Sequence, residues 1–73
     1  MKLVSDREYN ATGGEVKMQG ILNGGTAVLS VKTSKAAGFT AAKTWSADEV
    51  VIVDLPQGKY KVTLTGSAEV TLG

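Results

Sequence analysis

The chain has 73 residues, a formal net charge of +1 and a sequence pI near 8.0. This length predicts a single domain over 1–73 whose core supplies only about 3–5 kcal/mol of stability. Cysteine and histidine are both absent, so disulfides and thiolate or imidazole metal sites are excluded as stabilising devices. Oligomerisation is the common device that remains, and the near-neutral charge predicts neither a nucleic-acid nor a membrane partner.

The N-terminal residues predict a short strand and no targeting signal. Charged residues at 6–8 interrupt the segment before an apolar stretch develops, which differs from a signal peptide. No apolar run approaches the ~20 residues of a membrane span. We therefore expect synthesis in a cytoplasm, strand residues over 2–5 and 8–10, and a flexible connector over 10–14.

Two alternating segments, 15–20 and 26–32, flank the strong turn signal Asn23-Gly24. Asn and Gly both tolerate positive φ, so this pair favours a two-residue type I′ turn between paired strands. We predict a hairpin here with one apolar face and one ionic face. Its expected cross-strand pairs are Val16 with Val31, Met18 with Leu29, and Glu15 with Lys32.

Residues 33–48 contain the only Phe and the only Trp of the chain, Phe39 and Trp45. This stretch is rich in Ala, Ser and Thr, shows neither a helical nor a strand period, and would be costly to nucleate as a short helix. We predict a loop with a short strand near 39–45. Trp45 has two interpretations, a core anchor for this loop or a contact with a partner subunit or ligand.

The last third of the chain, 50–73, predicts a three-stranded meander. Its first turn signal, 55–58, is Leu-Pro-Gln-Gly, with proline and glycine where a β-turn needs them. A second turn over 66–68 would return the chain as a third strand. With a loop over 56–59, the expected cross-strand pairs are Leu55 with Tyr60, Val53 with Val62, Val51 with Leu64, and Asp54 with Lys61.

Together these segments predict an all-β fold, a small antiparallel β-sandwich or a partly open barrel of about six short strands. Val50 and Ile52 fall on the face of the meander opposite to its core residues, so their strand is apolar on both faces. An exposed apolar patch beside unpaired sheet edges is a liability unless another surface covers it. The expected cover is a second sheet or a neighbouring protein.

The sequence assigns no catalytic, cofactor-binding or metal-binding residue. Without Cys and His the usual nucleophile–base pairs are missing, so the chain is predicted not to be an enzyme. Asp48, Glu49 and Asp54 form the only close acidic group, whose alternatives are an acid–base pair or Ca²⁺ ligands. We predict solvated surface charges instead, because Asp48 and Glu49 lie at a loop-to-strand junction and Lys61 opposes Asp54.

The run DLPQGKYKVTL over 54–64 resembles the L-P-x-G-x-Y-x-V turn of many immunoglobulin-like and prealbumin-like β-sandwich modules. The Thr- and Gly-rich tail over 64–73 is similar to the chain ends of small virion structural proteins of tailed bacteriophages. The resemblance covers about a third of the chain, and its turn motif occurs in many unrelated families.

The resemblance implies a capsid decoration (cement) protein or a tail-associated protein, located in the virion after synthesis in the host cytoplasm. Such proteins bind shell or tail subunits as homo-oligomers, trimers among them, and catalyse nothing. The contact residues we expect are Phe39, Trp45, Val50 and Ile52. The alternative function is a carbohydrate-binding or adhesion module in which Trp45 stacks against a glycan.

Overall fold

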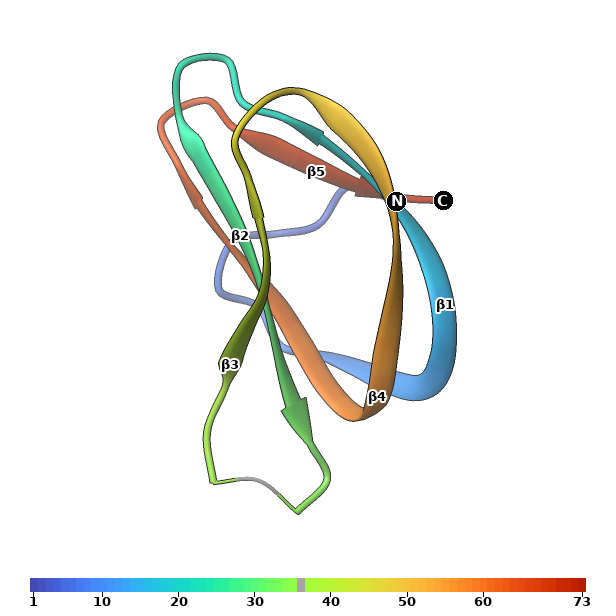
Figure 1. Cartoon of the computed structure of the whole chain (residues 1–73). Helices are drawn as coiled ribbons and strands as arrows, with labels where there is room; N and C mark the ends of the chain where they lie inside the picture. Colours follow the sequence, from blue (N-terminus) through green and yellow to red (C-terminus); the bar gives the residue numbers. More distant parts are fainter. Residues whose placement is uncertain (36) are drawn as a thin grey trace.

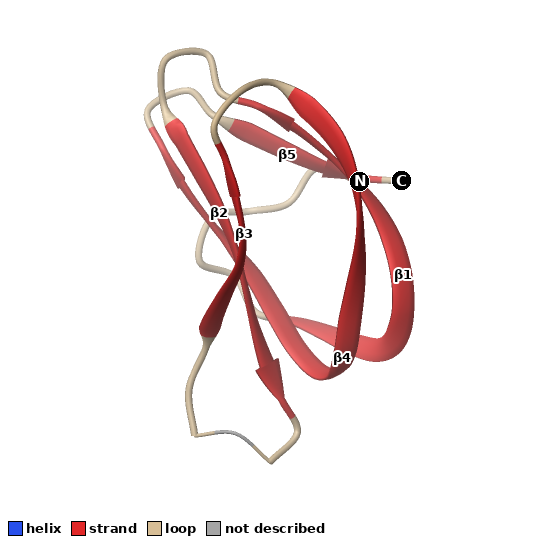
Figure 2. Ribbon diagram, viewed as in Figure 1, coloured by secondary structure: helices blue, strands red, loops and turns tan. Residues whose placement is uncertain are grey.

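The structure is a computed structural model that describes residues 1–35 and 37–73. Its strands are β1 (Tyr9–Ile21), β2 (Thr26–Thr33), β3 (Thr40–Trp45), β4 (Glu49–Thr65) and β5 (Glu69–Leu72). They form one antiparallel sheet in the order β3-β2-β4-β1-β5 (Figure 1). The described residues contain no helix (Figure 2). The all-β prediction is confirmed, with five strands in one sheet that does not close.

β1 pairs along almost its whole length with the Glu49–Tyr60 part of β4, and the two strands bend together at one corner (Figure 1). On β1 the corner contains Gly13 and Gly14, with φ of +88° and +106°. On β4 it contains Pro56 and Gly58, the latter with φ of +148°. L-residues with a Cβ rarely adopt such angles. Glycines therefore allow both strands to turn while their register continues.

The predicted hairpin at 55–58 is wrong. β4 is one strand of 17 residues that runs through Pro56, and it pairs with β1 from Glu49 to Tyr60 and with β2 from Gly58 to Thr65. The expected pairing of Asp54 with Lys61 is likewise wrong, since Asp54 lies opposite Glu15. Proline lacks an N–H and bends the strand here, but antiparallel partners on both sides of the corner keep the chain extended.

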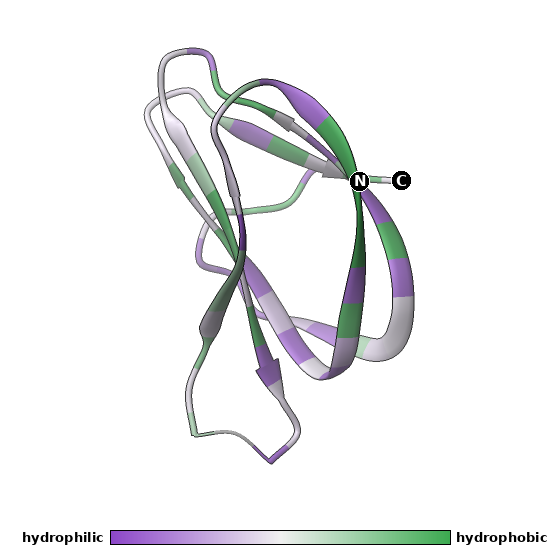
Figure 3. Cartoon of the chain, in the orientation of Figure 1, coloured by the Kyte–Doolittle hydropathy of each residue, from purple (hydrophilic) through white to green (hydrophobic). Residues whose placement is uncertain are grey.

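The corner also changes which residues of β4 face the core. Before it the inward side chains stand at odd positions, with Leu55 buried, and after it at even positions, with Tyr60 and Val62 buried. Because of this shift, the apolar residues predicted to form the inner face of the hairpin do face the core. They do so as parts of one long strand and not as two paired strands. Figure 3 shows the alternation of polar and apolar residues as purple and green bands along β1 and β4.

The Asn23-Gly24 turn is confirmed, but the hairpin around it is not. Both residues have positive φ, +48° and +83°, and the Gly25 N–H donates to the Leu22 carbonyl at 2.7 Å. Beyond this turn β1 and β2 diverge, because each pairs with a different part of β4. The predicted cross-strand pairs between 15–20 and 26–32 therefore do not form.

The predicted meander is also corrected at its third strand. β5 exists where a strand was expected, but it pairs with β1 and not with β4. Residues 10–14, expected to be a connector, belong to β1. The short strand expected near 39–45 is confirmed as β3.

The core lies inside the bend of the sheet. Its fully buried large side chains are Met18, Leu29, Val62 and Val70, one each from β1, β2, β4 and β5. Trp45, at the end of β3, is 2% exposed and packs over Gly20, where a Cβ would stand 2.5 Å from the indole ring. β1 thus needs a glycine at this position to admit the only tryptophan.

Candidate functional site

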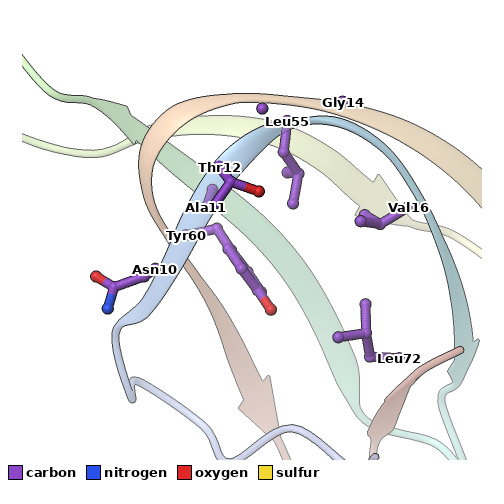
Figure 4. A pocket seen from close by; sticks show the side chains of 9 residues that line it. Asn10, Ala11, Thr12, Gly14, Val16, Leu55, Tyr60 and Leu72 are labelled. Carbon is purple, nitrogen blue, oxygen red and sulfur yellow. The ribbon is translucent and has the colours of Figure 1, made fainter.

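A pocket of about 210 Å³ opens at the corner of the sheet, where β1 and β4 bend. Figure 4 shows the side chains of Val16, Leu55, Tyr60 and Leu72 pointing into this space. The Tyr60 ring stacks on Tyr9 with 5.4 Å between centroids. Burial, and to a smaller extent Tyr9, raise the pKa of the Tyr60 phenol above its ordinary value near 10. The pocket thus holds a protonated Tyr60 hydroxyl, and its lining also includes the polar residues Asn10 and Thr12.

A second surface feature surrounds Phe39 on the outer face of β2 and β4. The Lys61 Nζ lies 4.7 Å from the centre of the Phe39 ring, and the Lys32 Nζ lies 6.0 Å from it. Lys32 also stands directly opposite Lys59 in the β2–β4 ladder. These lysines are far apart in the sequence. The pairing of β2 with β4 brings them together.

A third feature is the open side of β4 over residues 49–55. β1 pairs with this half of β4, whereas β2 pairs only with the later half, so the other side has no strand among the described residues. The Gly73 N–H donates to the Lys17 carbonyl at 3.0 Å, which directs the Lys17 backbone groups toward β5. Backbone groups alternate in direction along antiparallel strands. Ile52, the cross-strand partner of Lys17, therefore turns its N–H and C=O toward the open side.

The side chains beside this open edge are apolar and exposed, as the sequence predicted for Val50 and Ile52. Val50 is 56% exposed and Ile52 is 70% exposed. Both lie on the outer face of the sheet, opposite Gln19 and Lys17 of β1. The edge thus combines backbone groups without a strand partner and two aliphatic side chains in contact with solvent.

The other edges of the sheet are protected. Beside β5, Leu3 donates its N–H to the Val70 carbonyl at 2.9 Å, and Leu72 donates to the Met1 carbonyl at 2.7 Å. β3 is only six residues long, its pairing with β2 contains a register shift, and it contains Lys43. Short length, a bulge and a lysine are the usual protections of an edge strand. The described residues of β4 over 49–55 show none of the three.

The structure places the remaining predicted residues as follows. Trp45 is a core residue, so of its two interpretations the core anchor is the one observed, and its ring is not available as a surface contact. Phe39 is half-buried beneath the lysines. Asp48 accepts the Leu22 N–H at 2.8 Å, and Glu49 forms an ion pair with Lys43 at 2.8 Å. These two carboxylates therefore hold the ends of β1 and β3.

The described residues contain no group of three or more acidic, His or Cys side chains close enough to bind a metal ion. They also include no helix that is long and apolar enough to cross a membrane. Comparison with protein-family models, with curated proteins and with solved structures gives no match to this chain. Its function has to be argued from the surface itself.

Proposed function

We propose that this chain is a non-catalytic structural protein that acts by packing against itself and against other protein subunits. The observation that carries the proposal is the open edge of β4, with Val50 and Ile52 exposed beside it. Unpaired strand edges are templates for another chain, and exposed aliphatic side chains add apolar area to such a contact. A domain of this size, without disulfides or a His or Cys metal site, also gains stability from association.

More specifically, we propose a virion accessory subunit of a tailed bacteriophage, either a capsid decoration protein or a tail-associated protein. Its support is the resemblance of the C-terminal third, together with an edge suited to a lasting contact. The genes beside its own should then encode capsid or tail proteins. Neighbours that encode secreted or sugar-degrading proteins would count against the virion assignment.

The carbohydrate-binding alternative is based on the turn resemblance to β-sandwich modules and on Trp45 as a stacking platform. The Trp45 ring packs in the core, and the Phe39 ring lies under Lys61. Neither ring offers the free flat face that a sugar needs. We therefore do not retain this alternative.

The test of the packing function is a pair of matched substitutions. Val50→Lys places a charge beside the open edge, and Val4→Lys places the same charge at an equally exposed valine away from it, 54% against 56%. Both proteins are compared with the wild type by sedimentation velocity over a concentration series. We expect Val50→Lys to reduce association and Val4→Lys to leave it unchanged. Equal association of all three proteins would contradict the assigned edge.

A further inference from the structure

Two pairs of like charges stand directly opposite each other in the ladders of this sheet. Lys32 faces Lys59 across β2 and β4, and Glu15 faces Asp54 across β1 and β4. Both pairs lie on the outer face, because their chain neighbours Val31, Tyr60, Val16 and Val53 belong to the core or pack against it. Like charges directly opposite destabilise an antiparallel pair. The described strands contain one such pair of each sign.

The cationic pair has little compensation within the chain. A third lysine, Lys61, lies near this pair, and both Lys61 and Lys32 lie against the Phe39 ring. The one carboxylate in an ion pair here is Glu8, whose Oε1 stands 3.8 Å from the Lys59 Nζ, with both side chains about half exposed. Such an exposed contact contributes little. The described part of this surface is therefore net positive.

The anionic pair is similarly uncompensated. Neither Glu15 nor Asp54 forms an ion pair among the described residues, and both are exposed. The nearest lysine on the same face of the ladder is Lys17, two residues after Glu15 on β1 and opposite Ile52. Asp54 lies within the open segment of β4. Together with Glu15, its cross-strand partner, it forms a pair of carboxylates without an ion-pair partner among the described residues.

The corner of the sheet prevents the two pairs from neutralising each other. Asp54 and Lys59 are separated along β4 by Pro56 and Gly58, about 16 Å of strand at ~3.3 Å per residue. Among the described residues, no ion pair joins a member of the cationic pair to a member of the anionic pair. β4 bends at the corner that lies between them (Figure 1).

We propose that copies of this chain bind each other head to tail, with Lys32 and Lys59 of one copy against Glu15 and Asp54 of the next. Charge complementarity identifies the partner, since each copy carries both halves of the contact. Phe39 lies beside the cationic half and Ile52 beside the anionic half, so an aromatic and an aliphatic side chain accompany the charges. A contact between two different surfaces is heterologous, and it closes into a ring where the rotation allows.

This inference rests on the proposed function, because it names a second copy as one of the partners. An acidic segment of an unrelated protein could meet the same lysines, but it would leave Glu15 and Asp54 opposed without compensation. Nucleic acid is disfavoured as well, since Phe39 is covered by lysine and not free for base stacking. In a head-to-tail array, one neighbouring copy compensates the cationic pair of a chain and the neighbour on the other side compensates its anionic pair.

The test uses charge reversal with rescue. One variant combines Lys32→Glu with Lys59→Glu, and the other combines Glu15→Lys with Asp54→Lys. Each variant keeps a like-charge pair in the ladder, although the first also loses the Lys59 contact with Glu8 and the Lys32 contact with Phe39. We expect the wild type to associate at about 0.1 M salt and to dissociate at about 1 M, where the screening length falls to about 3 Å. Each variant alone should lose association, and an equimolar mixture of the two should recover it.

The outcomes separate this inference from the proposed function. If the wild type associates but both variants associate equally well, the head-to-tail contact is wrong and packing through the β4 edge is not affected. If the mixture fails to recover association, the inference is also overturned. A wild type that remains monomeric at micromolar concentration and low salt contradicts both this contact and the self-association part of the function. Circular dichroism of each variant confirms that it is folded.

Discussion

The edge beside β5 and the unpaired stretch of the central strand β4 differ in how they are covered. Beside β5, the N-terminal residues donate and accept backbone hydrogen bonds with Val70 and Leu72, so that edge is closed by the chain itself. Beside β4, residues 49–55 have no strand on their outer side in the described part of the chain, and Val50 and Ile52 are exposed there. The chain thus covers its β5 edge with its own N-terminal residues, whereas the outer side of β4 over 49–55 has no such cover among the described residues. We interpret the open edge as the functional one.

The largest effect is expected from opening the edge that is closed. Leu3 is buried and anchors the N-terminal residues beside β5. Leu3→Ala should lower the free energy of unfolding by about 2–5 kcal/mol, because it leaves a cavity and frees the segment that protects β5. Denaturant unfolding measures this loss. Val4→Ala, next in the chain and exposed, should change stability by less than about 0.5 kcal/mol.

A smaller loss is expected where β1 passes beneath Trp45. Gly20→Ala places a methyl group within 2.5 Å of the indole ring, so the ring or the strand has to move. The expected cost is about 1–3 kcal/mol, and near-ultraviolet circular dichroism should report the displaced tryptophan. Gly14→Ala is a useful comparison, because nothing lies within 4 Å of its Cβ and only its φ of +106° opposes the change. A silent Gly20→Ala would contradict the packing described for Trp45.

An increase in stability is expected from breaking a like-charge pair. Lys32→Glu turns the pair with Lys59 into one of opposite charges and should stabilise the monomer by about 0.2–1 kcal/mol. The gain should shrink at high salt because both groups are exposed to screening. Thermal unfolding at two salt concentrations measures it. A loss of stability would show that Lys32 has a structural role that its contacts do not reveal.

The smallest effect on folding is expected at the open edge itself. Ile52→Lys should change the free energy of unfolding by no more than about 0.5 kcal/mol, since Ile52 is 70% exposed. It should nevertheless weaken association, because a lysine is the usual protection of an edge strand. Stability and association measured on one preparation would separate the two roles. A large loss of stability would place Ile52 in the core.

Sequence reasoning identified which residues face inward but not how the strands connect. The alternation of polar and apolar residues correctly predicts which side chains of β4 face the core, because this pattern depends only on neighbouring residues. Pro56 and Gly58 predict a reversal of the chain, whereas in the structure they form a bend within β4. Local residues cannot distinguish the two, since the outcome depends on β1 and β2 pairing on either side. The same missing information hid the approach of Lys32 to Lys59.

The candidate site was predicted in part. Strand alternation predicts that Val50 and Ile52 lie on the face opposite to the core, and the structure confirms that both are exposed. Trp45 is buried because Gly20, 25 residues earlier in the sequence, leaves space for its ring. A glycine in an alternating strand is a weak signal of close approach, and nothing local indicates which side chain approaches. The like-charge pairs needed the register, which the sequence alone did not provide.

Amide hydrogen exchange in the dilute monomer tests the contrast between the two edges most directly. The account predicts fast exchange at Ile52, whose N–H points to the open side of β4, and slow exchange at Leu72, whose N–H donates to Met1 at 2.7 Å. At concentrations where copies associate, the Ile52 amide should become protected if the partner pairs with that edge. Equal protection of Ile52 and Leu72 in the dilute monomer would contradict the open edge and the function built on it.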